Sequence, residues 1–257
     1  VASVDNLPLN LNMNPNMVTK IRDILGGLDE TESFSPRVKF GAMFGNFKET
    51  TNIRLNAVDP KHEAATVPLL TKRIVKGGVE DGLVAKGKIL VPELIAKGMK
   101  VKLSDTIVLV ATNQDGSVNG RTLKVQGVLE GISGPGGRDG YIHVDDARAL
   151  LRMKQPDVSE IAVRLLHVGS TDATTNELQT ALSGITNKMG KPMFEVHAWQ
   201  KLTPFSNIAK MIDLLTLFIQ IMLIAIVLIS IMNVMVMAVF ERVREIGAIA
   251  AIGTQPH

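Results

Sequence analysis

The sequence predicts an α+β domain that is followed by one membrane-spanning helix. Residues 1–205 alternate between helical and strand periodicity and carry charges throughout. Residues 214–240 contain no charged residue, and the mean hydropathy of the whole chain is above zero although 21% of the residues are charged. A helix over 214–240 would be ~40 Å long, which exceeds the ~30 Å hydrocarbon core of a bilayer. We therefore expect residues 206–240 to form a transmembrane helix, because a buried helix of a soluble protein rarely runs this long without a charge.

The composition excludes several classes of site. The chain of 257 residues has no cysteine, so disulfides, zinc-thiolate sites, iron–sulfur clusters and cysteine nucleophiles are ruled out. Its 28 basic and 25 acidic residues give a net charge of +3, which is no indication of nucleic-acid binding. Aromatic residues make up only 4%, which argues against a surface for stacking bases or sugars.

The first elements of the domain are a helix and a β-hairpin. Residues 15–28 place apolar side chains on one face of a helix, with Asn14 as its N-cap and Gly26-Gly27 near its end. Residues 37–59 alternate between apolar and polar side chains on both sides of a turn at Gly45-Asn46. We therefore expect a hairpin that ends at Asp59-Pro60, with Val38, Phe40 and Ala42 on one strand and Ile53, Leu55 and Ala57 on the other.

The rest of the domain continues the alternation of helices and strands. Helices are expected at 64–75, 93–97, 145–153 and 174–189. Strands are expected at 89–91, 105–111, 121–129, 141–144, 160–166 and near 194–197. A turn at Asp115-Gly116 or Asn119-Gly120 is expected to join the strands at 105–111 and 121–129.

Two short motifs resemble ligand sites but lack the residue that does the chemistry. Residues 82–88 fit a phosphate-binding loop until Ile89, which stands where a Ser or Thr would hold magnesium. Residues 115–120 resemble the start of a calcium loop, but Gln126 stands where a bidentate carboxylate is needed. The histidines show no metal-ligand spacing and no carboxylate pair is marked out as acid and base, so we expect neither a metal site nor catalysis by this chain.

The apolar segment carries a polar stripe. At ~100° per residue, Thr216, Gln220 and Ser230 lie within about 40° of one line along the helix, and Asn233 lies off it. In a membrane such side chains face another helix or a cavity, which makes these four residues candidates for helix packing. An alternative interpretation is that Ser and Thr bond only to their own backbone.

Charged residues return immediately after the apolar segment. Pairs at i, i+3 join Glu241 to Arg244 and Arg242 to Glu245, while Ile246, Ile249 and Gly253 form an apolar and small face. We expect residues 241–257 to begin with a short amphipathic helix that docks on a partner. Because the chain starts at Val1 without an initiator Met and ends soon after this helix, we also expect it to be a piece of a longer, multi-pass membrane protein.

These residues carry a family resemblance. The run from Asn233 to Gly247, with Glu-Arg-Val-Arg-Glu-Ile-Gly at 241–247, followed by Ala251-Ile252-Gly253, resembles the second membrane helix and coupling helix of the FtsX-like ABC transporter permeases. That superfamily includes the lipoprotein-releasing LolC/LolE permeases and the MacB exporters. Weaker matches resemble successive strands of their periplasmic core domain, in the right order, at 35–37, 57–60, 88–92 and 125–128.

The resemblance implies a MacB-like periplasmic core domain over 1–205, a membrane helix over 206–240 and a truncated cytoplasmic coupling helix over 241–257. It implies a location in the bacterial inner membrane and a role in mechanotransmission, in which movement of a partner ATPase reaches the periplasmic domain for export or lipoprotein release. The chain itself would be no enzyme and hold no cofactor, since ATP and magnesium would be bound by the ATPase. The residues that would couple to the ATPase are Glu241, Arg242, Arg244, Glu245, Gly247 and Gly253.

Other partners and alternatives stay open. The resemblance implies a second permease subunit in a homo- or heterodimer, membrane lipid, and a lipoprotein or other amphipathic substrate. The long loop with which LolC-type permeases capture a carrier would correspond to residues 113–120, where this chain has only a short turn. The alternative function is that of a single-pass membrane protein whose extracytoplasmic domain binds or senses a ligand.

Overall fold

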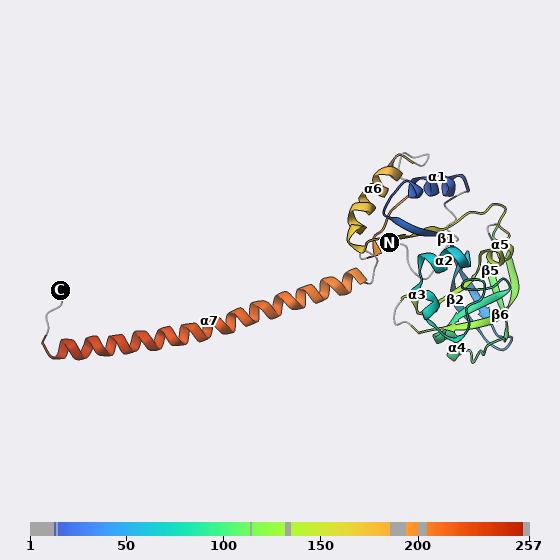
Figure 1. Cartoon of the computed structure of the whole chain (residues 1–257). Helices are drawn as coiled ribbons and strands as arrows, with labels where there is room; N and C mark the ends of the chain where they lie inside the picture. Colours follow the sequence, from blue (N-terminus) through green and yellow to red (C-terminus); the bar gives the residue numbers. More distant parts are fainter. Residues whose placement is uncertain are drawn as a thin grey trace. The chain divides into compact units, whose positions relative to one another are not determined.

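The computed structural model describes Met13 and residues 15–113, 115–131, 135–185, 194–199 and 205–253. The chain divides into two units, Val1–Val196 and His197–His257, which are described separately as unit 1 and unit 2. Unit 1 is a mixed α/β fold and unit 2 contains one long helix (Figure 1).

Unit 1 is built on one sheet in which six strands close on themselves. The strand order is β2-β7-β4-β6-β5-β1-β8, and the further pairing of β1 with β2 closes the ring. The short strand β3 pairs with β6 outside this path. The strands are β1 (Thr31–Gly45), β2 (Thr50–Val58), β3 (Ile74–Gly77), β4 (Lys88–Pro92), β5 (Thr106–Thr112), β6 (Val118–Leu129), β7 (Asp139–His143) and β8 (Glu160–Leu165).

Strand β1 is long enough to belong to two parts of unit 1. Its first half pairs with β8, with Phe34 opposite Val163. Its second half lies in the closed ring, with Phe40 opposite Leu55 of β2 and Met43 opposite Val110 of β5. This single strand therefore connects the closed ring of six strands, which we call the barrel, to the part of unit 1 that contains β8.

Helices cover both parts. In sequence order they are α1 (Pro15–Gly26), α2 (Pro60–Thr66), α3 (Leu69–Lys72), α4 (Glu93–Gly98), α5 (Val144–Leu150) and α6 (Thr171–Ser183), with 3₁₀ turns at Pro135–Arg138 and Val168–Ser170. Figure 1 shows α1 and α6 near each other at one end of unit 1, and α4 and α5 beside the barrel strands. The main core lies inside the ring and extends to α1 and α6, and it includes Phe44, Leu55, Ile107, Leu25 and Leu178.

The hairpin expected at 37–59 is confirmed, and it is formed by β1 and β2. Val38, Phe40 and Ala42 of β1 are buried, as are Ile53, Leu55 and Ala57 of β2, because apolar side chains alternate along both strands. The expected helices at 15–28, 93–97 and 145–153 correspond to α1, α4 and α5, and the strands at 89–91, 105–111, 121–129, 141–144 and 160–166 correspond to β4 to β8. The turn between β5 and β6 lies at Asp115-Gly116, while Asn119-Gly120 belongs to β6.

Two expectations for unit 1 are wrong. The segment 64–75, expected as one helix, consists of the end of α2, all of α3 and the first residues of β3. Pro68 separates the two helices, because proline has no N–H to donate and restricts the backbone of the residue before it. The strand expected near 194–197 is irregular chain: the backbone N–H of Val196 donates to the side chain of Gln179 in α6 and not to a strand. The Asn14 cap and residues 186–189 of the expected helix at 174–189 lie outside the described residues.

Unit 2 is dominated by α7 (Phe205–Ala251), a helix of 47 residues. We expected a membrane helix ending at 240 and a second, short helix after it, but one helix runs through both segments. The sequence explains this continuity, since α7 contains no proline and its one glycine is Gly247.

Candidate functional site

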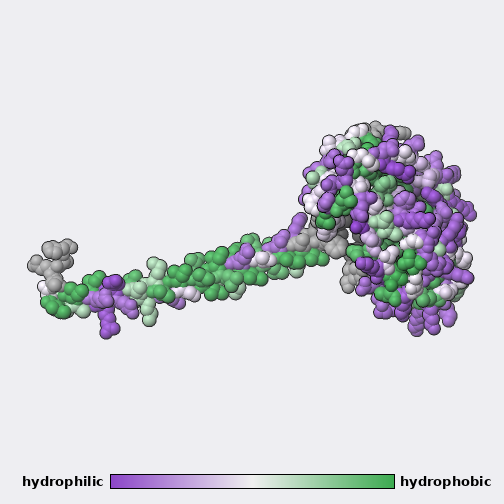
Figure 2. All heavy atoms as spheres, viewed as in Figure 1, coloured by the Kyte–Doolittle hydropathy of each residue, from purple (hydrophilic) through white to green (hydrophobic). Residues whose placement is uncertain are grey.

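The apolar surface of α7 is the most unusual feature of the chain. The stretch Lys210–Ala251 is long and apolar enough to cross a membrane. No residue of its most apolar 18-residue segment is buried. Figure 2 shows hydrophobic side chains along most of α7, whereas the surface of unit 1 is mostly hydrophilic. Exposing this much apolar surface to water is costly, so α7 is a candidate membrane-spanning helix.

The polar stripe on α7 is partly satisfied by the helix itself. Thr216 Oγ1 donates to the carbonyl of Ile212 at 2.9 Å, and Ser230 Oγ donates to the carbonyl of Ile226 at 3.0 Å. Among the described residues, no hydrogen bond is formed by the side chains of Gln220 or Asn233. Gln220 and Asn233 therefore offer amide groups to a neighbouring helix, while Thr216 and Ser230 offer only their remaining acceptor capacity.

The charged end of α7 presents two kinds of surface. Arg242 Nη1 lies 3.4 Å from Glu245 Oε2, the i, i+3 spacing expected from the sequence. Glu241 and Glu245 are one helical turn apart, and Arg244 lies between them in sequence. The apolar side chains of Val243, Ile246 and Ile249 are all more than half exposed, so this end is amphipathic and uncovered in the described chain.

The two glycines of this end differ in conformation. Gly247 lies inside α7, and a Cβ placed there would meet no atom within 4 Å in the described chain. Gly253 lies two residues after the end of α7 with φ +91°, and its N–H donates to the carbonyl of Ala250 at 3.2 Å. Gly253 therefore ends the helix, a role that its glycine identity could have indicated, since glycine after the last turn is a common helix stop.

Unit 1 contains a buried ionic cluster where its two parts meet. Arg37 of β1 contacts Glu63 of α2 through two hydrogen bonds, and its Nη1 lies 3.2 Å from Glu160 Oε1 of β8. Burial by itself lowers the pKa of Arg37, but the hydrogen bond and the charge of Glu63 outweigh it and hold this pKa above its usual value. Burial also raises the pKa of nearby Tyr141 to about 12. Arg37 therefore stays charged and Tyr141 stays neutral at neutral pH, which is typical of a structural cluster.

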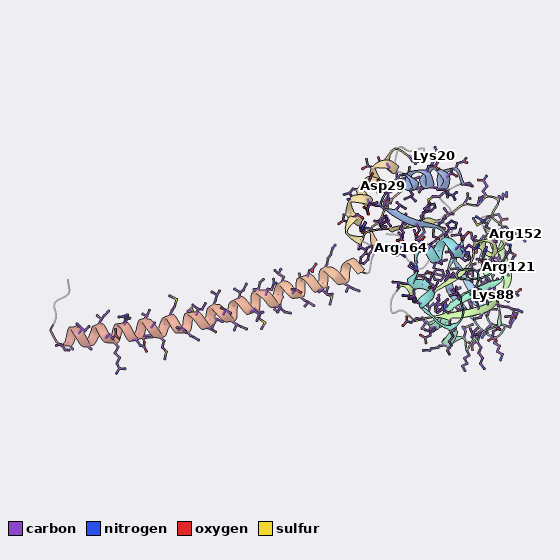
Figure 3. All side chains as sticks on the ribbon, viewed as in Figure 1. Lys20, Asp29, Lys88, Arg121, Arg152 and Arg164 are labelled. Atoms are coloured by element: carbon purple, nitrogen blue, oxygen red, sulfur yellow. The ribbon has the colours of Figure 1, made fainter. Side chains whose placement is uncertain are left out.

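The segment that resembles a phosphate loop is held by side chains of unit 1. The N–H of Gly87 donates to Asp146 Oδ2 at 2.6 Å, and this buried carboxylate also lies 2.9 Å from Arg121 Nη2. Lys88 begins strand β4 and pairs with Glu80. Figure 3 labels Lys88 and Arg121 on the barrel strands. The motif therefore leads into a strand, whereas a phosphate loop leads into a helix.

The segment that resembles a calcium loop forms a turn. Asp115 Oδ1 accepts hydrogen bonds from the N–H and the hydroxyl of Ser117, which lowers the pKa of this carboxyl. Gln126, the position that a ligand would need, is buried in β6. Its side chain accepts from Ala85 N and donates to the carbonyls of Gly78 and Leu83. Gln126 is thus a structural link between β6 and the segment before β4.

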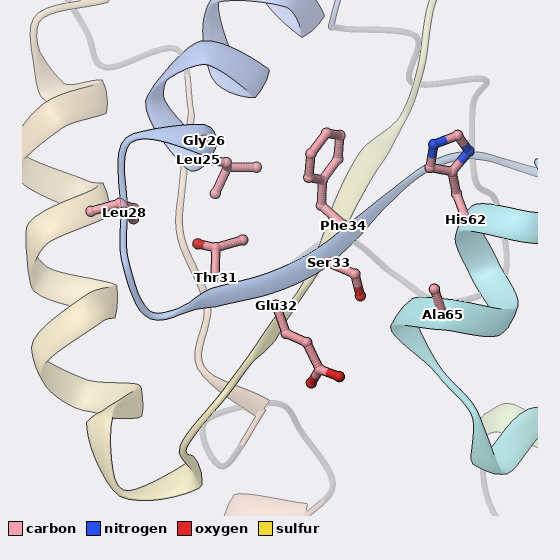
Figure 4. A pocket seen from close by; sticks show the side chains of 9 residues that line it. All are labelled: Leu25, Gly26, Leu28, Thr31, Glu32, Ser33, Phe34, His62 and Ala65. Carbon is pink, nitrogen blue, oxygen red and sulfur yellow. The ribbon is translucent and has the colours of Figure 1, made fainter.

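A groove of about 240 Å³ lies beside the start of β1 in unit 1 (Figure 4). Leu25 and Thr31 point into it from α1 and β1, and Phe34 and His62 point to the same side of β1. The groove is smaller than the ~300–1,000 Å³ typical of ligand pockets. No group of three or more potential metal-ligating side chains is found among the described residues.

Comparison with known proteins gives matches only among solved structures. No family model and no curated protein matches the chain. The extracellular domain of the noncanonic ABC-type transporter YknZ from Gram-positive bacteria is 17% identical, with a TM-score of 0.49 over 70% of this chain and 88% of that one. The periplasmic region of MacB from Actinobacillus actinomycetemcomitans is 11% identical, with a TM-score of 0.49 over 76% of this chain and 82% of that one. These two similar structures are thus the extracellular domain of a transporter and a periplasmic region.

Proposed function

We propose that the chain is part of an ABC transporter permease in the bacterial inner membrane. In this proposal, unit 1 lies on the extracytoplasmic side, α7 crosses the bilayer, and the charged end of α7 contacts a partner ATPase. Movement driven by ATP hydrolysis in that partner then reaches unit 1 and serves export or lipoprotein release. The proposal is supported by the resemblance of residues 233–253 to the FtsX-like permeases and by the geometry of α7.

The continuity of α7 is the observation that carries the proposal. A helix of 47 residues is ~70 Å long, whereas a bilayer with its headgroups is ~40–45 Å thick. The basic residues that flank the apolar run are Lys210 and Arg242. They are ~48 Å apart along the helix axis. The last turns of α7 therefore extend beyond the bilayer as a continuation of the membrane helix, and a displacement at one end is transmitted to the other.

The chemistry of the extended end suits a protein partner. Val243, Ile246 and Ile249 provide apolar surface, and Glu241, Arg242, Arg244 and Glu245 provide charges that can pair across an interface. Gly247 lets a partner approach the backbone closely, since no side chain covers it. We propose that this segment occupies a groove of the ATPase and that Thr216, Gln220, Ser230 and Asn233 face a second permease subunit or helix.

The experiment that tests the proposal interrupts the helix between its two ends. Replacing 237–239 by three glycines costs about 1 kcal/mol per residue of helix stability, whereas three alanines at the same positions keep the helix rigid. The 257 residues contain no cysteine, so once any cysteines elsewhere in the full-length protein and in the ATPase are replaced, spin labels on one cysteine introduced at Lys154 and on one in the ATPase report the distance between them. We expect addition of ATP and vanadate to change this distance in the alanine variant and not in the glycine variant, with ATP hydrolysis retained in both.

Two results would count against the proposal. An equal distance change in the glycine and alanine variants would show that α7 does not transmit the movement. If no ATPase co-purifies with the full-length protein, the single-pass sensing protein becomes the better account.

A further inference from the structure

The apolar run of α7 presents three faces. At ~100° per residue, consecutive side chains of a helix point in directions that differ by more than a quarter of a turn. Ile226, Val227 and Leu228 lie at the middle of the uncharged run 214–240, and each belongs to a different face. We name each face after the one of these residues that it contains, since all three lie at nearly the same depth along the helix.

The Val227 face contains the polar stripe. Thr216, Gln220 and Ser230 all lie within about 60° of Val227 around the helix axis. The stripe belongs to a seam whose steps alternate between four and three residues, at positions 216, 220, 223, 227, 230, 234 and 237. This spacing is typical of the contact line between two packed helices, in water and in membranes. One neighbouring helix can therefore cover all three polar side chains.

The Ile226 face contains Asn233. This residue lies ~20° from Ile226 and ~120° from Val227 around the axis, so it belongs to a second seam. The second seam has the same alternating steps, at positions 222, 226, 229, 233, 236 and 240. Gln220 and Asn233 are ~140° apart, whereas a seam that faces one neighbour is narrower than about 100°. A single neighbouring helix therefore cannot reach both amides.

Both amides lie inside the hydrocarbon when the apolar run is centred in a bilayer. Gln220 is ~10 Å before Val227 and Asn233 is ~9 Å after it, and half of the hydrocarbon thickness is ~15 Å. The Cα–Cβ bond of Asn233 tilts toward the N-terminus of α7, that is, toward the bilayer centre, so its amide cannot extend to the nearer headgroups. Within the part of the chain that the structure describes, this amide forms no hydrogen bond. Because an unpaired amide in hydrocarbon is costly, Asn233 requires a partner outside α7.

The Leu228 face consists only of large apolar side chains. Its members lie within about 40° of Leu228, and all of them are more than half exposed. They are Leu217, Ile221, Ile224, Leu228, Met232, Met235 and Val239. Lipid tails are as apolar as these side chains, whereas contacts between membrane helices favour small and polar residues. This face therefore suits lipid.

We propose that α7 packs against two neighbouring transmembrane helices, one along the Val227 face and the other along the Ile226 face, while the Leu228 face contacts lipid. The neighbour on the Ile226 face carries a hydroxyl or amide side chain at the depth of Asn233, ~9 Å from the bilayer centre toward Glu241. The inference rests on the proposed function, since it requires that α7 spans a membrane. It goes further by assigning separate neighbours to the polar stripe and to Asn233.

The test is photo-cross-linking of the full-length protein in the membranes of its host. A photoreactive phenylalanine analogue replaces Ile226, Val227 or Leu228 in three separate variants, and mass spectrometry identifies what each position binds. The three positions serve as controls for one another, because they lie at nearly the same depth and point in different directions. We expect adducts with two different transmembrane segments at positions 226 and 227, and adducts with lipid alone at position 228.

A second pair of variants tests the role of the Asn233 amide. A hydrogen bond between membrane helices changes an equilibrium by about threefold to tenfold. Asn233→Leu should therefore reduce the protein adduct at position 226 by about this factor and leave the adduct at position 227 unchanged. Met232→Leu is the matched control on the Leu228 face and should change neither adduct.

Several results would overturn the inference alone. They are an adduct of positions 226 and 227 with the same segment, lipid alone at position 226, a protein adduct at position 228 beside lipid, or equal effects of Asn233→Leu and Met232→Leu. In each of these cases a lipid adduct at position 228 leaves the proposed function standing. If none of the three positions gives a lipid adduct, α7 does not lie in a bilayer, and the inference and the proposed function both fail.

Discussion

The guanidinium of Arg37 and the carboxylate of Glu63 form a buried, two-bonded ion pair that joins β1 to α2. The Nη2–Oε1 distance is 2.6 Å and the Nε–Oε2 distance is 3.0 Å, and the Glu63 side chain is completely buried. Arg37 also reaches Glu160 of β8. This one side chain therefore connects the barrel to the strand that lies outside it, at the middle of β1.

Removing one partner of this pair should destabilise unit 1. Arg37→Met leaves Glu63 buried without its counter-ion, and we expect a loss of about 3–5 kcal/mol in the free energy of unfolding. The matched control is Lys39→Met, because Lys39 also pairs with Glu160 but is 40% exposed, so its loss should cost about 1 kcal/mol or less. Chemical unfolding of the detergent-solubilised protein measures both. Equal effects of the two substitutions would show that the buried pair has no special role.

Asp59 should make the stability of unit 1 sensitive to acid. Its carboxylate caps α2 by accepting from the N–H groups of Lys61 and His62. Partial burial raises the pKa of Asp59, but these bonds and the nearby His62 outweigh it and hold the pKa below its usual value. A lowered folded pKa means that the stabilisation is complete above the unfolded pKa and is lost as the pH falls through the folded one.

Two substitutions at this cap separate charge from hydrogen bonding. Asp59→Ala should cost about 1 kcal/mol at pH 7, whereas Asp59→Asn keeps a capping oxygen and should cost less. The difference in unfolding temperature between the natural protein and Asp59→Asn should shrink as the pH is lowered from 6 to 3. A difference that stays constant over this range would contradict the assigned cap.

Gly77, the last residue of β3, and Gly78, which follows it, should respond very differently to substitution. Gly77 has φ +89°, and a Cβ there would lie 2.2 Å from the carbonyl oxygen of Gln126, whereas a Cβ on Gly78 would meet no atom within 4 Å in the described chain. Gly77→Ala should therefore cost about 3 kcal/mol or more, while Gly78→Ala should be close to neutral. Thermal unfolding of the two variants is the measurement, and a tolerated Gly77→Ala would show that β3 does not pack on β6 this closely.

Charge reversal at the extended end of α7 should uncouple ATP hydrolysis from transport. Under the proposed function, Glu245→Lys breaks the pairing with Arg242 and places a positive charge at the interface, and Gly247→Leu blocks close approach of the partner. Lys210→Glu, at the other end of the apolar run, is the control and should keep coupling. Transport that persists in both variants of the extended end would remove these residues from the docking surface.

Most of the fold of unit 1 was predictable because its strands alternate clearly. The inward faces of β1 and β2 follow directly from the sequence pattern, and α1 follows from its helical spacing. The helix expected at 64–75 is wrong because Pro68 divides this segment into two short helices. The closure of the sheet depends on pairings between distant strands, such as β2 with β7, which no local pattern encodes.

The candidate sites were predictable to different degrees. The apolar run and its charged end are local features of the sequence, and the structure places both on α7. The Arg37–Glu63 pair joins residues 26 positions apart and could not be predicted without the fold. The exposure of Phe47 and its left-handed backbone cannot be deduced from its residue type. Gly253 could have been identified as a helix stop from its identity alone.

The proposed function requires that α7 crosses the membrane and places unit 1 and the charged end of α7 on opposite sides of it. The 257 residues contain no cysteine, so once any other cysteine of the full-length protein is replaced, single cysteines at Lys154 in unit 1 and at Arg244 in α7 can be labelled in spheroplasts with a membrane-impermeant maleimide. We expect labelling at position 154 in intact spheroplasts and at position 244 only after the membrane is permeabilised. Labelling of both positions, or of neither, before permeabilisation would contradict it.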